Sequence, residues 1–175
     1  MPARALILVD FENEWTLPSS EYFVGDIKSM IERTNGVIDF CRAQGDKIIF
    51  TTHVEKDSDG AFAEGTNQVE IVSNLHKEAH DTLITKNKIS PFYKTKLETE
   101  LVGVEQIVVC GILTNLCVRS LVQDAYDRDF SIIVLKDCCV ALDDETHVFT
   151  LKDLKETRPE VVVETSYDFL RAILV

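Results

Sequence analysis

The chain is poor in the residues that mark fibrous, disordered or nucleic-acid-binding proteins. Seven glycines and four prolines among 175 residues exclude a collagen-like or low-complexity chain. The apolar fraction, 45%, is too high for intrinsic disorder. Positive charge is also scarce, because 18 Lys and Arg stand against 30 Asp and Glu, a net charge of −12. Such a chain repels phosphate backbones and anionic lipids, so we expect no nucleic-acid and no membrane partner.

Long apolar runs are missing as well. The run at residues 5–9 is interrupted by Asp10 and is too short for a signal or membrane-spanning segment. Five cysteines are an odd number in a chain with no secretory signal, which indicates reduced thiols and a cytoplasmic location. The length suits one domain with a full core, and no repeat, linker or charge block divides it. We therefore expect a single domain over residues 1–175.

Short apolar runs alternate with helical patterns along the whole chain. We expect strands at residues 5–9, 47–50, 82–85, 107–110, 131–135 and 161–163. Helices are expected at residues 27–41, 69–77, 97–102, 118–126, 144–156 and 167–174. Apolar strands separated by helices form parallel βαβ units, so we predict an α/β fold, a three-layer α/β/α sandwich with a six-stranded, mainly parallel sheet. Four cysteines are expected as buried thiols: Cys41, Cys110, Cys138 and Cys139.

Three chemically capable residues stand where predicted strands end, which is where parallel sheets place their chemistry. Asp10 follows the first strand, Lys86 the third, and Cys117 opens the helix after the fourth. The positive end of a helix dipole and a nearby ammonium favour a thiolate, and a carboxylate can take the thiol proton. Backbone N–H groups at the helix start can hold an oxyanion. Taken singly, Asp10 suits a turn, Lys86 a solvated side chain and Cys117 core packing.

Three segments around these residues resemble the isochorismatase-like cysteine hydrolases. This superfamily includes nicotinamidases, N-carbamoylsarcosine amidohydrolases and ureidoacrylate amidohydrolases. The matching segments are ALILVDFENEW at residues 5–15, LITKNKISPF at 83–92 and GILTNLCV at 111–118. The resemblance runs from about residue 4 to residue 165. It implies the isochorismatase-like, Rossmann-like fold and a hydrolase.

The resemblance also implies a role for each site residue. Cys117 would be the nucleophile, Asp10 the general base, and Lys86 the cation that stabilises the thiolate and positions Asp10. A cis peptide bond between Ile112 and Leu113 would turn the Leu113 N–H toward that of Cys117, so that the two form an oxyanion hole. The side chains expected to bind substrate are Trp15 (where the family usually has Phe), Phe92 and Thr114.

The chain departs from the nicotinamidases at their metal site. These enzymes carry an Asp-x-His pair after the second strand and a further His, whereas residues 51–53 of this chain read TTH. His53 alone makes a poor zinc site, and we expect His76 and His80 on the surface. We therefore expect no metal and no cofactor. Glu12 is a second departure, because the family usually has Gln there.

The leading functional hypothesis is a cofactor-free amidohydrolase. It would cleave a C–N bond of a small amide, carbamoyl or ureido compound through a thioester on Cys117. The alternatives are a nicotinamidase, an isochorismatase-type vinyl-ether hydrolase, which needs no thiol, and a catalytically silent oligomeric binding protein. The expected partners are a small-molecule substrate and further copies of the chain. A homodimer or homotetramer is expected because the family commonly forms them and the apolar residues Ala141 and Leu142 could serve an interface.

Overall fold

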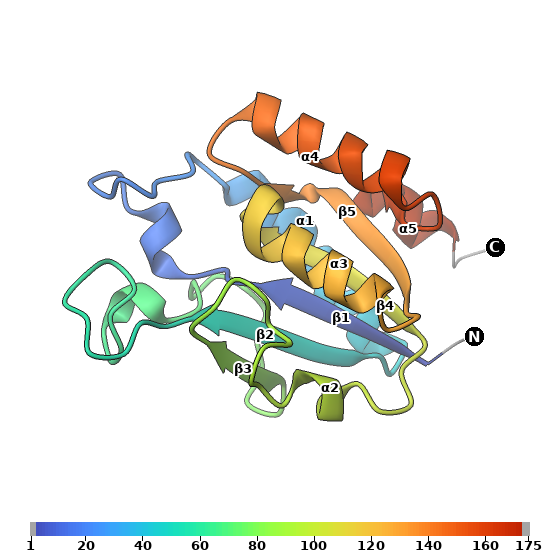
Figure 1. The fold of residues 1–175 in the computed structure, drawn as a ribbon, viewed down its shortest axis with the longest axis horizontal. Helices are drawn as coiled ribbons and strands as arrows, with labels where there is room; N and C mark the ends of the chain where they lie inside the picture. The colour runs from blue at the N-terminus through green and yellow to red at the C-terminus, as the bar shows by residue number, and fades with distance from the viewer. Residues whose placement is uncertain (1–2, 173–175) are drawn as a thin grey trace.

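Residues 3–172 are described by a computed structural model, in which six strands form one sheet (Figure 1). The strands are β1 (Arg4–Val9), β2 (Lys47–His53), β3 (Thr82–Lys86), β4 (Gln106–Ile112), β5 (Ser131–Val140) and β6 (Val162–Glu164). Their order is β3-β2-β1-β4-β5-β6, and every neighbouring pair is parallel. The predicted α/β class is confirmed, and the sheet is wholly rather than mainly parallel.

Helices cover both faces of the sheet. They are α1 (Lys28–Ala43), α2 (Leu97–Glu100), α3 (Arg119–Tyr126), α4 (Asp144–Thr157) and α5 (Ser166–Ala172). Helices α1 and α5 pack on one face, and α2, α3 and α4 pack on the other. Three short turns complete the chain: the 3-10 turns η1 (Asn13–Thr16) and η2 (Asn67–Val69), and the π turn η3 (Thr114–Val118). Within residues 3–172 no helix is long and apolar enough to span a membrane.

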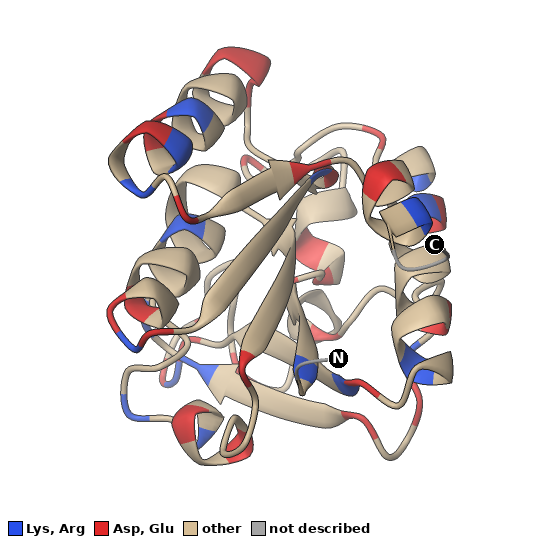
Figure 2. Cartoon of the chain, turned by 90° about the vertical axis from the view of Figure 1, so that its right-hand side faces the viewer, with Lys and Arg blue, Asp and Glu red and all other residues tan. Residues whose placement is uncertain are grey.

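The sequence pattern explains why these segments pack as they do. All six residues of β1 are buried, because Leu6 and Leu8 face the α1 side while Ile7 and Val9 face the α3 side. Strands buried on both faces are apolar throughout, which is how a parallel sheet appears in sequence. Charged residues lie mainly on the helices and connections, and the strands are mostly uncharged (Figure 2). Helix α1 buries one face, which includes Ile31, Ile38 and Cys41. Gly45 follows the helix with φ of +79°.

The helix predicted at residues 69–77 is wrong. Only η2 forms there, and the chain then runs extended beside residues 11–13. Glu12 and Ile71 form an antiparallel bridge, and the Val72 N–H donates to the Phe11 carbonyl at 2.9 Å. These tertiary hydrogen bonds take the place of helical ones. The helix predicted at 167–174 is confirmed as far as Ala172, and its last two residues lie outside the described part of the chain.

The strand order brings the predicted site together. Neighbours β1 and β4 lie at the point where the order reverses, and the chain leaves them toward opposite faces. Ligands of open parallel sheets bind outside the carboxyl ends of the strands at this point. Gly111 lets the ends of β1 and β4 approach closely, because a Cβ at this position would lie 2.5 Å from the Cβ of Val9. The residues after β1 and β4 therefore meet.

Candidate active site

Lys86 lies between the other two predicted site residues, Asp10 and Cys117. Its ammonium Nζ lies 2.7 Å from Oδ2 of Asp10 and 3.3 Å from Sγ of Cys117. The three side chains come from the ends of β1 and β3 and from η3. All three lie beneath the surface, since the exposed fraction is 0% for Asp10, 3% for Lys86 and 9% for Cys117. The structure thus places carboxylate, ammonium and thiol in one buried cluster.

Asp10 is held by strand β2. Its backbone N–H donates to the Thr51 carbonyl at 3.1 Å, and the Thr51 hydroxyl donates to Oδ1 of Asp10 at 2.5 Å. The backbone of Asp10 adopts the left-handed region, with φ of 53°, which is uncommon outside glycine. Strained backbone of this kind persists only where the surroundings enforce it. With Oδ1 bound to the hydroxyl, Oδ2 is the oxygen that faces Lys86.

Lys86 has an acceptor for each of its three N–H donors. Besides Asp10 and Cys117, Nδ1 of His53 lies 3.5 Å from the ammonium. Burial and the charge of Lys86 lower the pKa of His53, so the ring is neutral and Nδ1 can accept. Burial by itself would lower the pKa of Lys86, but the Asp10 carboxylate and Cys117 raise it above its ordinary value. Lys86 is therefore a fixed, fully paired cation.

Cys117 is a thiol at rest, although the Lys86 ammonium beside it favours the thiolate. Burial and the Asp10 carboxylate raise the pKa of the Cys117 thiol to about 12, and Lys86 only partly offsets them. Desolvation and a neighbouring negative charge both disfavour a second anion in the cluster. The charge pattern at rest is thus Asp10 carboxylate, Lys86 ammonium and Cys117 thiol. The carboxylate is the group available to take the thiol proton.

The turn that carries Cys117 differs in detail from the prediction. Cys117 lies within the π turn η3, and the regular helix α3 begins two residues later at Arg119. The peptide bond between Ile112 and Leu113 is cis. The Leu113 carbonyl accepts from the Val118 N–H at 3.2 Å, which closes the turn around the cysteine. The Leu113 carbonyl thus binds the turn that carries Cys117, and the oxyanion hole formed by the Leu113 and Cys117 N–H groups stays a prediction.

The three expected substrate-binding side chains are all buried. Trp15 is 6% exposed and packs at a tilt against Phe62 and edge-on against Tyr22, at ring-centroid distances of 5.0 and 6.0 Å. Phe92 packs on the same side of the sheet as Cys117, with the Arg128 guanidinium 4.3 Å from its ring centroid.

The third of these side chains, Thr114, is already paired. It is fully buried, and its hydroxyl lies 2.8 Å from Nδ1 of His147 in α4. This contact ties the turn that carries the cysteine to the helix beside it.

Glu12 is a buried acid near Asp10 that the sequence did not predict as a site residue. It lies two residues after Asp10, and its exposed fraction is 0%. Burial and the Asp10 charge raise the pKa of Glu12 to about 9. The only indication in the sequence is a Glu where Gln is usual, and this pattern could not show that the carboxyl lies buried.

The residues present do not fit the metal site of the nicotinamidases. Within residues 3–172 no group of three His, Cys, Asp or Glu side chains is arranged to hold a metal ion. His53 faces the Lys86 ammonium, and the Thr51 hydroxyl binds Asp10. A cation beside the imidazole opposes a second cation there.

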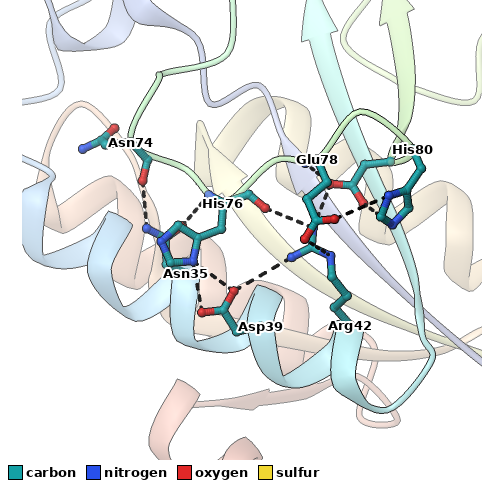
Figure 3. Close-up of polar contacts among 8 residues, drawn as sticks. Asn35, Asp39, Arg42, Asn74, His76, Glu78 and His80 are labelled. Carbon is teal, nitrogen blue, oxygen red and sulfur yellow. Dashed lines mark hydrogen bonds and ion pairs between the residues drawn. The ribbon is translucent and has the colours of Figure 1, made fainter.

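His76 and His80 belong to a surface network, as predicted (Figure 3). His76 lies 2.9 Å from Asp39 of α1, and His80 lies 3.5 Å from Glu78. In the same network Arg42 of α1 contacts Glu78 at 3.2 Å and donates to the His76 carbonyl at 3.0 Å. This network fixes residues 74–81 on α1, on the opposite face of the sheet from Cys117.

Comparison with known proteins shows the family to which the chain belongs. The model of the isochorismatase domain family matches residues 4–166. The chain belongs to the isochorismatase family.

Individual relatives support the same assignment. The chain is 26% identical over 165 residues to nicotinamidase 3 of Arabidopsis thaliana, covering 86% of this chain and 79% of the relative. It is 28% identical over 170 residues to the ureidoacrylate amidohydrolase RutB of Methylorubrum extorquens, covering 77% and 68%. An isochorismatase family protein from Desulfovibrio vulgaris has the same fold, with a TM-score of 0.91, 20% identity and full coverage of both chains.

Proposed function

We propose that this family member is a cysteine-dependent amidohydrolase that cleaves a C–N bond of a small amide, carbamoyl or ureido compound. That it is a hydrolase of C–N bonds follows from its family and from relatives named amidohydrolases. The cysteine mechanism rests on one observation, the Lys86 ammonium held between the Asp10 carboxylate and the Cys117 sulfur. A buried base, cation and thiol in contact are the parts that nucleophilic catalysis needs.

The first half of the reaction forms a thioester. Asp10 takes the proton of the Cys117 thiol as Sγ attacks the substrate carbonyl carbon. Lys86 stays protonated and stabilises the sulfur anion as it develops, since the thiol has a pKa of about 12 at rest. The backbone N–H groups of Leu113 and Cys117 receive the oxyanion. When the C–N bond breaks, Asp10 returns the proton to the departing nitrogen, and an amine or ammonia leaves.

The second half restores the enzyme. A water molecule gives a proton to Asp10 and adds to the thioester carbonyl. The C–S bond then breaks, Cys117 regains its proton from Asp10, and the acid product leaves. Each proton accepted by Asp10 is returned within the cycle, so the reaction consumes only substrate and water and needs no metal or cofactor.

The alternatives fit the site less well. Vinyl-ether hydrolysis protonates an alkene and makes no use of a thiol, whereas Cys117 sits in contact with Lys86. A nicotinamidase with the family's metal would need ligands that residues 51–53 do not provide. A silent binding protein has no need of the buried ion pair of Asp10 and Lys86. Removing two charges from water costs free energy that their mutual attraction does not always repay.

We also propose that the chain forms a homo-oligomer. The expected interface residue Leu142 is 54% exposed, while its neighbour Ala141 is buried. Val148 and Phe149, further along α4, are each 63% exposed. Light scattering of the purified chain should give a dimer or larger, and Phe149→Asp should reduce the mass. A wild-type monomer at micromolar concentration would contradict the proposal.

The function is tested by ammonia release from a panel of small amides, N-carbamoyl compounds and ureides. We expect turnover of at least one class, and Cys117→Ala should reduce it by about 10⁴-fold or more. Cys138→Ala, which removes another buried thiol, is the matched control and should keep wild-type turnover. Equal turnover by wild type and Cys117→Ala would refute the thioester mechanism. No turnover together with an unreactive Cys117 would favour the silent binding protein.

A further inference from the structure

The turn η3, which carries Cys117, is held partly by a side chain of another helix. Leu113 stands at the start of the turn and has no polar side chain that could cap its free N–H groups. Thr114 comes next, and a threonine in such a place often binds the backbone of its own turn. Here its hydroxyl lies 2.8 Å from Nδ1 of His147 in α4 instead. The support of η3 therefore includes an imidazole from outside the turn.

His147 reaches two other elements from a capped helix. Its helix, α4, begins after Asp143, whose carboxylate accepts hydrogen bonds from the N–H and the hydroxyl of Thr146 at 2.7 and 2.8 Å. In the first turn of α4, the imidazole contacts Thr114 of η3, and the backbone of Lys136 in β5 hydrogen-bonds the same ring. Helix α4 also packs against both η3 and β5. The ring thus joins the turn of Cys117 to the sheet and to α4.

The pair formed by Thr114 and His147 is shielded from water and uncharged. Thr114 is 0% exposed. Burial lowers the pKa of His147, and this effect exceeds those of the Asp144 carboxylate and the Lys136 backbone, which raise it. A neutral imidazole offers one donor and one acceptor nitrogen, and a hydroxyl can be the partner of either. Loss of the imidazole would leave the hydroxyl buried without this partner, which is unfavourable, so the turn would shift to recover a hydrogen bond.

The position of η3 decides how the cysteine contacts its cation. Sγ of Cys117 lies 3.3 Å from Nζ of Lys86, and Lys86 lowers the pKa of the thiol against the effects of burial and Asp10. Thr114 lies three residues before Cys117 and directly after Leu113, whose N–H is a proposed oxyanion donor. A displacement of η3 would therefore change the Sγ–Nζ distance and the position of that donor together. A misplacement of about 1 Å can cost about 10²-fold in rate.

We propose that His147 is a positioning residue that holds Cys117 in place through the hydroxyl of Thr114. The inference rests on the proposed function, because it concerns the turn of the proposed nucleophile. It gives Thr114 a role other than the expected one, since its hydroxyl is bound by His147 and is not kept free for substrate. His147 acts through Thr114 in this role and needs no contact with the substrate.

Alkylation of Cys117 tests the positioning without knowledge of the substrate. Iodoacetamide forms an S–C bond with the thiolate and releases iodide, so its rate at neutral pH follows the thiolate fraction. Peptide mass spectrometry measures the rate at Cys117 at neutral and at alkaline pH. His147→Leu and Thr114→Val should each lower the rate at neutral pH by about threefold or more, because Sγ loses part of its stabilisation by Lys86. The difference from wild type should shrink at alkaline pH, where more of the thiol is ionised.

Three further variants separate this role from a loss of stability. His147→Asn keeps a polar atom near the position of Nδ1, so it should recover most of the wild-type rate. The double variant of His147→Leu and Thr114→Val should lose no more than either single variant, because both changes remove the same contact. Thr150→Val is the matched control, since Thr150 is 1% exposed and its hydroxyl donates to the Thr146 carbonyl within α4 at 2.7 Å. Its rate should equal that of wild type.

Each other outcome overturns the inference. Wild-type rates in His147→Leu and Thr114→Val would show that the contact does not position Cys117, and faster rates would show that it only covers the sulfur. Losses that add in the double variant would show two separate effects, and an equal loss in Thr150→Val would show a general weakening of α4. If His147→Leu does not fold, Thr114→Val must still slow the labelling while His147→Asn does not.

The proposed function fails in a different way from the inference. A wild-type Cys117 that iodoacetamide does not label at any pH would refute the nucleophile and, with it, the role of His147. Equal rates in wild type and in every folded variant would refute the positioning role alone.

Discussion

Two cysteines of this protein, Cys117 and Cys138, have opposite environments. Cys138 is fully buried in β5, and hydrogen bonds from Cys110, and then Thr34, lower the pKa of its thiol despite burial. Cys117 is 9% exposed in η3, the turn that follows β4, and burial and the Asp10 carboxylate raise the pKa of its thiol to about 12. By acidity alone, Cys138 would be taken as the nucleophile.

Under the proposed mechanism, a neighbouring base matters more than the resting acidity of the thiol. Asp10 raises the pKa of Cys117, yet it is also the group that can accept the proton during attack. The carboxylate that acts on Cys138, that of Asp137, accepts hydrogen bonds from Ser166, and the Cys138 sulfur is buried in the core beside Cys110. The proposed mechanism therefore makes Cys117 reactive during the reaction, when Asp10 takes the thiol proton, and not at rest.

Replacing the proposed base, Asp10, should have the largest effect on kcat, and it should change kcat and the pKa of Cys117 independently. Asp10→Asn cannot accept or return a proton, so kcat should fall by about 10²–10⁴-fold. The same change removes a negative charge beside the thiol, so the pKa of Cys117 should fall. Steady-state kinetics and the pH dependence of alkylation measure the two effects. An Asp10→Asn variant with normal kcat would show that Asp10 is not the base for Cys117, so a neighbouring base would no longer distinguish Cys117 from Cys138.

Removing the cation should act in the opposite direction on the thiol. Lys86 lowers the pKa of Cys117, so Lys86→Met should raise it and shift the pH–rate profile to the alkaline side. The shift should be about one pH unit or more, with a loss of rate at neutral pH. Wild-type kinetics at every pH would show that Lys86 is only a structural partner of Asp10.

Removing the second thiol should change stability but not turnover. Cys138→Ala leaves a small cavity in the core and should lower the free energy of unfolding by about 1–2 kcal/mol. Turnover should stay at the wild-type level, as measured on folded protein. Loss of kcat with an unchanged fold would place Cys138 in the mechanism.

Chelation should have the smallest effect of all. His53 faces Lys86, and His76 and His80 lie on the other side of the sheet, so residues 3–172 offer no set of ligands comparable to a zinc site. Turnover after exhaustive dialysis against a chelator should equal that of untreated enzyme. Loss of activity that zinc restores would show that a distant residue completes a metal site.

The fold could be predicted closely because its strands are apolar on both faces and its helices carry one stripe each. The segment at residues 69–77 could not, because Val69 and Val72 have helical spacing while the backbone pairs with residues 11–13. Strands β2 and β5 also extend beyond their apolar runs, to His53 and Val140. Local sequence does not contain the partner strand that extends them.

Some features of the candidate site could also be predicted from the sequence, and others could not. The positions of Asp10, Lys86 and Cys117 follow from strand ends and from the family resemblance, and the structure brings all three into contact. The protonation state of Cys117 and the buried carboxyl of Glu12 depend on burial and on neighbours from other strands. Such effects arise only when distant segments pack together.

The central claim, that Cys117 is the assisted nucleophile, is tested most directly by brief iodoacetamide treatment at neutral pH. Peptide mass spectrometry then measures the labelled fraction of each of the five cysteines. We predict that Cys117 is labelled first, because it is the most exposed of the five and the only one that Lys86 contacts within residues 3–172. Labelling of Cys138 or Cys139 ahead of Cys117 would contradict the account.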